Sequence, residues 1–235
     1  MAAEFVSGAT AADGASYTPG SGTDTLLVWV PSGYRSGTTT TSSQTYDSVS
    51  MTEREDITMD LTGGGDPVAN ISDLVNPATG ANTIDLTWSS GLTNETGYAF
   101  TVEGVDQTTP LDSSDSATYN VDNSPSFTIN APANSFIVYF RLHAANTGGG
   151  TPTWTEPTGF TERFDNTLIT TPAFREVRVF TRDVTTALSS FSLSSPTTGT
   201  AIGGIHGYAI YNEASVGGGI SIPVVINHLR NQGIQ

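Results

Sequence analysis

The sequence predicts an all-β protein, an antiparallel β-sandwich, on three observations. Apolar and polar side chains alternate in many short segments, such as Tyr98, Phe100 and Val102 against Ala99 and Thr101, which is the pattern of a strand with one face on a core. Turn-forming Gly, Pro, Asn and Asp separate these segments at roughly 8–15-residue spacing. No segment shows the longer period of an amphipathic helix. We expect roughly eleven or twelve strands in a jelly-roll-like arrangement.

The first half of the chain is expected to begin with a weak strand around Phe5 and Val6, inside a small, polar N-terminal arm. A Thr/Ser-rich stretch at 35–45 is expected to be a surface loop or a flexible linker. Gly63–Pro67 is a turn; it lacks the Lys-Ser/Thr and the following helix of a phosphate-binding loop. The strands expected in this half lie at 26–30, 46–51, 57–61, 68–75 and 84–88. Trp88 is expected to be a core residue, because it completes the apolar face of Ile84 and Leu86.

The second half is expected to open with a buried strand that leaves its sheet through a stiff loop at 105–112. Asp106 can bond its own downstream backbone, and Pro110 fixes its φ angle, so we expect this loop to be structural. The strands expected in this half lie at 98–103, 127–129, 136–142, 177–179, 191–193 and 205–211. No internal repeat is apparent in the sequence.

The expected organisation is an N-terminal arm at 1–23, a β-sandwich domain at 24–214 and a C-terminal tail at 215–235. The tail follows a glycine hinge at 217–219 and is strongly apolar, as a helix or as a strand. Such a segment has to be covered by its own domain or by a partner. The residues expected at a partner interface are Ile220, Ile222, Val224, Val225, Ile226 and Leu229.

Composition excludes several classes of protein. The 235 residues carry a net charge of -15, from 23 acidic and 8 basic residues, and all the basic residues are Arg. A surface this acidic repels phosphate backbones, so we expect no nucleic-acid partner. The absence of Cys excludes disulfides and Cys-ligated metals. No apolar run reaches the roughly 20 residues of a membrane helix, and no secretory signal is visible.

Two acidic clusters raise the question of chemistry. Glu53 and Glu55, near Asp56 and Asp60, could act as a glycosidase carboxylate pair, but Arg54 lies between them and a solvated acidic edge is the simpler interpretation. Carboxylate and amide oxygens on a loop are ligands that Ca²⁺ takes. The second cluster lacks the spacing of a calcium loop, so we expect it to be structural. Its members are Asp112, Asp115, Asn120, Asp122 and Asn123.

The histidines and the loop aromatics are the other candidates. His143, His206 and His228 lack the spacing of a zinc site, and the first two fall among aromatic residues, so we expect core histidines. No nucleophile motif is present. The aromatic side chains of Tyr17, Tyr34 and Trp154 could form a platform on which a sugar stacks. We expect no catalytic residue, no metal and no cofactor.

Several segments carry a resemblance to a known family. They are SVSMT at 48–52, LVNPATGANTIDLTWS at 74–89, YAFTVEGVDQTTPLD at 98–112, SPSFTI at 124–129, SFIVYFRLHAAN at 135–146, TGFTERFDN at 158–166 and GIHGYAIYNEA at 204–214. Residues 20–214 resemble a β-sandwich domain of tailed-phage structural proteins and of uncharacterised bacterial proteins. The motif residues are Asn76, Pro77, Gly80, Asn82, Thr83 and Trp88, followed by Gly104, Val105, Asp106, Gln107, Thr108, Thr109 and Pro110.

The resemblance implies a non-enzymatic structural protein at the surface of a virus particle, most simply a capsid decoration or cement protein. Its partner would be the major capsid protein or another virion protein, and it would form a homo-oligomer such as a trimer. The alternative is a carbohydrate-binding or adhesive module on a phage fibre or cell surface. A weaker third reading is a polysaccharide-degrading enzyme that uses the acidic pairs. The chain departs from the family in lacking Lys and in carrying the apolar tail.

Overall fold

The structure, a computed structural model, describes residues 1–35, 41–61, 66–89, 91–119, 125–146, 153–169, 173–196 and 201–215. These residues form strands, turns and loops, with no helix among them. The sheets are antiparallel and packed face to face, so the expected antiparallel β-sandwich is confirmed. The strand orders do not confirm the finer jelly-roll connectivity.

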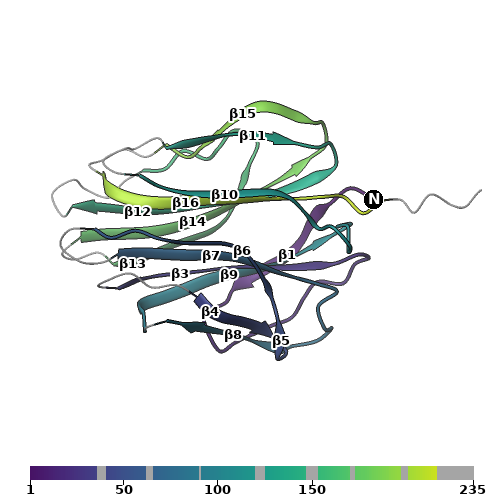
Figure 1. Ribbon diagram of the computed structural model, residues 1–235, viewed down its shortest axis with the longest axis horizontal. Coiled ribbons are helices and arrows are strands. Elements are labelled where there is room, and N and C mark those ends of the chain that lie inside the picture. Colours follow the sequence, from purple (N-terminus) through teal and green to yellow (C-terminus); the bar gives the residue numbers. More distant parts are fainter. Residues whose placement is uncertain are drawn as a thin grey trace, which may run out of the picture.

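Two five-stranded sheets form the centre of the molecule (Figure 1). The first has the order β1-β9-β3-β7-β6, with β1 at Glu4–Thr10, β9 at Thr93–Glu103, β3 at Leu26–Arg35, β7 at Asp66–Val75 and β6 at Thr52–Thr58. The second has the order β10-β16-β12-β14-β13, with β10 at Leu111–Tyr119, β16 at Ala201–Tyr211, β12 at Ser135–Asn146, β14 at Ala173–Val184 and β13 at Thr161–Ile169. Each central sheet therefore comes from one half of the chain.

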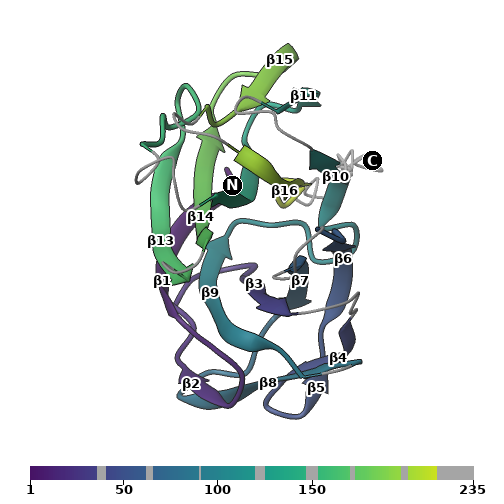
Figure 2. The same ribbon diagram turned by 90° about the vertical axis from the view of Figure 1, so that its left-hand side faces the viewer.

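A smaller sheet covers the outer face of each central sheet, so that the molecule has four layers (Figures 1 and 2). The cover of the first sheet has the order β2-β8-β4-β5, with β2 at Ala15–Tyr17, β8 at Asn82–Trp88, β4 at Thr41–Tyr46 and β5 at Val49–Ser50. The cover of the second sheet pairs β11 at Ser126–Ala131 with β15 at Leu188–Ser194. Alternating side chains of the central strands thus find a layer on each side.

Three apolar cores fill the spaces between the four layers. The central core contains Val28 of β3, Phe100 of β9 and Val138 of β12. The next residues along β3 and β12, Trp29 and Tyr139, point to the outer cores beneath the smaller sheets. Because successive side chains of a strand point to opposite faces, strands that are apolar on both faces become the middle layers.

The two halves of the chain have the same topology. Seven strands of the first half, β1, β2, β3, β6, β7, β8 and β9, correspond in order to β10, β11, β12, β13, β14, β15 and β16. Every pairing among the first seven has its counterpart among the second seven. Only β4 and β5 have no counterpart among the described strands. The expectation that the chain has no internal repeat is therefore wrong.

The pairing register supports this correspondence. Leu26 lies between Val75 and Val102, and Phe136 lies between Asp183 and Tyr211, so Leu26 and Phe136 are equivalent. The first strand of each half has an irregularity at the same place, between Phe5 and Ser7 in β1 and between Leu111 and Ser113 in β10.

The clearest trace of the repeat in the sequence lies in β6 and β13. Their segments TEREDIT at 52–58 and TERFDNT at 161–167 differ only at the fourth and sixth positions. Both strands have a β-bulge at the arginine, Arg54 or Arg163, which pairs with no residue of the neighbouring strand. A bulge leaves one residue out of the ladder and re-aims its side chain, so the two arginines are equivalent.

Several expected segments differ from what the structure describes. Residues 1–23, expected as an arm, contribute β1 and β2 to two of the sheets. Trp88 is only partly buried, whereas Trp29 is fully buried. The apolar tail residues 220–229 lie outside the described residues, as do His228, the glycines 63–65 and residues 120–124.

Candidate functional site

The residues of the resemblance motifs set backbone geometry. Asn76 and Gly80 have positive φ angles of 47° and 94°, and Gly104 has φ 69°. A side chain at Gly104 would also lie 2.3 Å from the carbonyl oxygen of Ala2. The carboxylate Oδ1 of Asp106 accepts the backbone N–H groups of Thr108 at 2.8 Å and Thr109 at 2.9 Å. These bonds lower the pKa of Asp106, and they confirm the turn chemistry expected of the loop.

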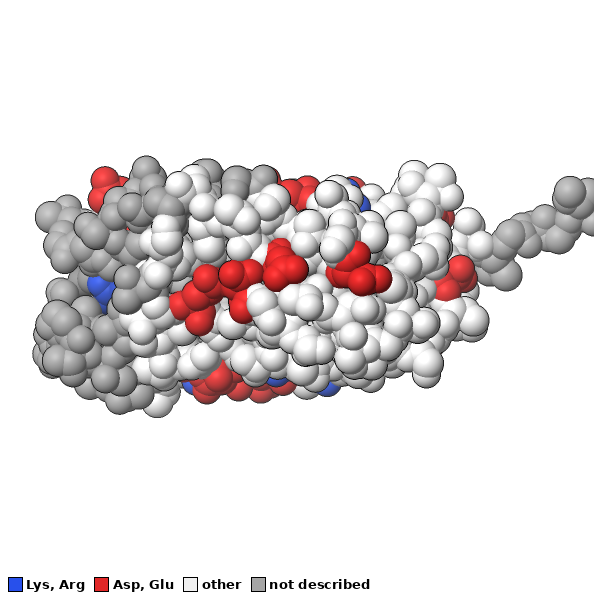
Figure 3. Space-filling view, turned by 90° about the horizontal axis from the view of Figure 1, so that it is seen from below, with Lys and Arg blue, Asp and Glu red and all other residues white. Residues whose placement is uncertain are grey.

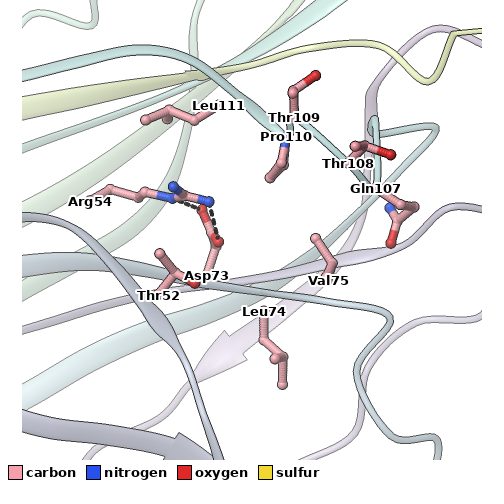
Figure 4. A pocket seen from close by; sticks show the side chains of 10 residues that line it. All are labelled: Thr52, Arg54, Asp73, Leu74, Val75, Gln107, Thr108, Thr109, Pro110 and Leu111. Atoms are coloured by element: carbon pink, nitrogen blue, oxygen red, sulfur yellow. Dashed lines mark hydrogen bonds and ion pairs between the residues drawn. The ribbon is translucent and has the colours of Figure 1, made fainter.

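The same loop borders a surface cavity of about 420 Å³ between β6, β7 and the start of β10 (Figure 4). Its lining residues are Thr52, Arg54, Asp73, Leu74, Val75, Gln107, Thr108, Thr109, Pro110 and Leu111. Its volume falls in the roughly 300–1,000 Å³ range of small-ligand pockets. It is the first candidate site.

A bidentate ion pair fixes the arginine in this cavity. Nε of Arg54 lies 2.6 Å from Oδ2 of Asp73, and Nη2 lies 3.0 Å from Oδ1. The side chain of Asp73 is 2% exposed and that of Arg54 is 17% exposed. Burial raises the pKa of Asp73, and the pairing with Arg54 opposes that rise. The guanidinium is therefore held rigidly, with part of its surface open to the cavity.

The acidic cluster next to this arginine is not arranged as a catalytic pair. Glu53 accepts a hydrogen bond from Nδ2 of Asn70 at 3.0 Å, on β7. Glu55 accepts one from Oγ of Ser116 at 2.6 Å, on β10. The two carboxylates therefore contact different central sheets. Asp60 is exposed and Asp56 half-buried, so the solvated acidic edge is only partly correct.

A second candidate site, the Arg141 cluster, lies on the outer face of the second central sheet. It consists of Tyr119, Arg141, His143, Trp154, Glu162, Asp165, Glu176, Arg178 and His206. Arg141 is fully buried, and its Nε donates to the hydroxyl of Tyr119 at 3.0 Å. Its Nη1 donates to the carbonyl oxygen of Ser195, and its Cζ lies 5.1 Å from the ring centroid of Trp154. These bonds and ring contacts are what a charge buried at this depth requires.

His143 is the neighbour of Arg141 on the same face of β12. Its Nδ1 lies 3.3 Å from the hydroxyl of Tyr119, and its ring meets that of Trp154 edge-on at 5.6 Å. Burial lowers the pKa of His143 to about 3, helped by the positive charges of Arg141 and Arg175. The imidazole is therefore neutral at neutral pH, and its pKa is too low for a general base working there.

Arg178 joins three carboxylates at the other side of the cluster. Nη2 of Arg178 lies 2.8 Å from Glu176 and 3.0 Å from Asp165, and Nη1 contacts Glu162. Burial raises the pKa of Glu176 to about 7, and a hydrogen bond with Asp165 adds to the rise. Hydrogen bonds from Trp154 and Arg178 lower the pKa and so oppose it.

A carboxyl group with a pKa near 7 has the value expected of a general acid or base. In Glu176, however, both oxygens already accept hydrogen bonds from the cluster, Oε1 from Arg178 and Oε2 from Nε1 of Trp154. This arrangement fits a carboxyl group that joins a loop to the sheet. No motif or spacing in the sequence marks Arg141, Glu176 or Arg178 as site residues.

The expected sugar-stacking platform is wrong for the three residues proposed. Tyr17 is buried in the outer core of the first half, and Tyr34 is buried in the central core. Trp154 belongs to the Arg141 cluster. These aromatic rings lie in different layers and share no surface.

The expected core histidines are confirmed for two of the three. His143 is fully buried, and His206 stacks on Phe127 with 4.1 Å between ring centroids.

The second acidic cluster is described in part. Asp112 and Asp115 are exposed on β10 and accept hydrogen bonds from the neighbouring Ser113 and Ser116. Among the described residues, no group of three or more His, Asp or Glu side chains could hold a metal ion. The described part of the chain also contains no helix long and apolar enough to span a membrane.

Comparison with known proteins gives no match. No family model matches the chain, and neither the curated proteins nor the solved structures yield a similar protein. The resemblance to tailed-phage structural proteins therefore depends on the sequence motifs quoted above and on nothing further.

Proposed function

We propose that this chain is a non-enzymatic structural protein of a virus particle, a decoration or cement protein that binds the capsid shell. The observation that carries the proposal is the use of the motif residues. Asn76, Gly80, Gly104 and Asp106 all set turn geometry. A family whose characteristic residues shape loops and sheets is defined by its architecture, which suits a structural role.

The surface charge supports docking on a basic neighbour. Figure 3 views the molecule from the side of the four-stranded outer sheet, and acidic side chains outnumber basic ones there. Exposed carboxylates of the four-stranded sheet and its adjoining turns include Asp85 on β8, Asp47 between β4 and β5, and Asp13, which bonds the backbone of β8. Complementary charge speeds association and selects partners. A basic patch on a shell protein is therefore the expected counterpart, and raised salt should slow the association.

The apolar tail supplies a second means of attachment. Ile220, Ile222, Val224, Val225, Ile226 and Leu229 lie outside the described residues, so their role stays a prediction. Apolar surface left in water costs roughly 25 cal/mol per Å², which favours burial against the shell or against a neighbouring copy of the chain.

The experiment is a binding assay with undecorated shells and the full chain, counting copies per shell. A chain truncated after residue 216 should fold with an unchanged melting midpoint and lose attachment or oligomerisation. A variant with Asp13, Asp47 and Asp85 changed to Asn serves as the matched test of charge. If the protein is absent from purified particles and binds glycans on an array, the proposal is wrong and the protein is an adhesive module instead.

A further inference from the structure

The two equivalent arginines of the repeat have different neighbours. Nε of Arg163 donates to Oγ1 of Thr181 at 2.8 Å, and Nε of Arg54 donates to Asp73. Thr181 and Asp73 are equivalent, because they pair with Thr161 and Thr52 at the start of the two TER segments. The backbone therefore aims both guanidinium groups the same way.

Among the described residues, an aromatic ring covers the guanidinium of Arg163 and none covers that of Arg54. Cζ of Arg163 lies 3.8 Å from the ring centroid of Phe5. Phe5 and Leu111 are equivalent, since they pair with Val102 and Tyr211 just before the irregularity in β1 and β10. Leu111 has no π surface, and it lines the open cavity beside Arg54 (Figure 4).

We propose that the cavity at Arg54 is a binding site for an aromatic side chain of a partner protein. The bidentate pairing with Asp73 fixes the plane of the guanidinium, and a flat, rigid cation is a good partner for an aromatic face. Val75, Pro110 and Leu111 supply apolar walls, and Thr108 and Gln107 supply polar groups. In the other half, a strand of the same chain places a ring on the equivalent arginine.

We infer a protein side chain as the occupant because the ring that lies on the equivalent Arg163 is the side chain of Phe5. Phe5 reaches Arg163 from a strand at the edge of its sheet. At Arg54 the position of Phe5 is occupied by Leu111, so a partner's Phe, Tyr or Trp would reach the guanidinium through the open cavity instead. This inference concerns the cavity alone, and it holds whether or not the partner belongs to a virus particle.

The test adds N-acetyl-phenylalanine amide, as the probe, to the full chain. Binding is measured by NMR from the Nε–H signals of the arginines. The probe should shift the signal of Arg54 and leave that of Arg163 unchanged. N-acetyl-cyclohexylalanine amide, which has a saturated ring of similar size and no π electrons, should bind at least about threefold more weakly, the effect of roughly 0.7 kcal/mol of cation–π attraction.

Reciprocal variants exchange the two halves. Leu111→Phe should place a ring on Arg54 and abolish probe binding, with Leu111→Met as the control that keeps it. Phe5→Leu should uncover Arg163 and create probe binding there, which tests the proposal even if Leu111→Phe does not fold. Equal affinity for the saturated analogue, no shift at Arg54, or full binding to Leu111→Phe would each overturn the proposal.

Discussion

The two halves of this protein share one topology but cover their outer faces differently. In the first half, a four-stranded sheet lies over β3, β7 and β9. In the second half, the cover has two strands, and the segment around Trp154 lies over the polar end of the sheet. Strands β4 and β5, which have no counterpart among the described residues of the second half, occupy the connection where Trp154 lies in that half.

Several equivalent outer positions carry charged or ionisable side chains in the second half and uncharged residues in the first. Arg141 and His143 correspond in register to Pro31 and Gly33, and Glu176 and Arg178 correspond to Val68 and Asn70. Most inner positions of both halves are apolar, and the equivalent residues Asp73 and Thr181 are exceptions. The strand order that both halves share therefore accompanies burial of the inner face. The outer face packs under an apolar sheet in the first half and carries a buried ionic cluster in the second.

The largest expected effect tests the apolar cover of the first half. Trp29 is fully buried, and its Nε1 donates to the carbonyl oxygen of Ala11 at 2.9 Å. Trp29→Ala should lower the free energy of unfolding by about 3–5 kcal/mol, because it leaves a cavity beneath the outer sheet. Trp88→Ala, at a partly buried position, should cost clearly less in the same urea titration. A cost at Trp88 equal to that at Trp29 would show that the outer core is centred elsewhere.

The next effect separates the two bulge arginines. Arg54→Ala should cost about 3 kcal/mol, because it leaves the buried carboxylate of Asp73 without its cation. Arg163→Ala should cost about 1 kcal/mol, since it removes a hydrogen bond to the neutral Thr181 and a ring contact. Denaturant titration of both variants measures the difference. The double variant Arg54→Ala with Asp73→Ala should recover part of the loss; no recovery would mean that the pair does not explain it.

A smaller effect is the pH dependence of stability that the Arg141 cluster gives to the second half. Because the folded pKa of Glu176, about 7, lies above its ordinary value of 4.5, the folded state holds this proton more tightly than the unfolded state. The stability it contributes is present below pH 4.5 and is lost as pH rises towards 7. Glu176→Gln should flatten that decline in melting midpoint between pH 4.5 and 7. His143, with its pKa lowered to about 3, acts in the opposite direction, so His143→Gln should steepen the decline over the shared range.

The smallest effect concerns the loop that joins the halves. In Asp106→Asn, the side-chain oxygen can still accept the N–H groups of Thr108 and Thr109, so the melting midpoint at neutral pH should fall only slightly. Asp106 has a lowered pKa, so its contribution is present above pH 3.8 and lost as pH falls further. The difference in melting midpoint between the wild type and the variant should be smaller at pH 3 than at pH 7. A large loss at neutral pH would mean that the charge itself holds the halves together.

The sequence allowed the fold class to be predicted because each strand carries its own alternation. Ile84 and Leu86 are buried on one face of β8, as the pattern requires. The repeat escaped notice because pairing involves residues far apart in the chain, and most equivalent strands share little identity. The two TER segments are the available signal, and the acidic residues of the first one by themselves favour a solvated acidic edge.

The Arg141 cluster could not be predicted for a different reason. A charged residue that alternates with apolar ones on a strand normally faces water, and Arg178 opposite Val177 and Val179 has that pattern. Here a further layer covers the outer face, so the charges are buried and paired instead. Only the number of layers distinguishes the two cases, and that number depends on how the whole chain packs.

The duplicated topology has a consequence for assembly. One half alone would expose to water the inner face of its five-stranded sheet, including Phe136, Val138 and Phe140 in the second half. The two halves therefore stand to each other as the subunits of a symmetric dimer do, fused through residues 104–110. In a dimer of identical chains, both arginine sites would be filled or both open. Fusion lets one site be closed by Phe5 while its twin beside Leu111 remains open.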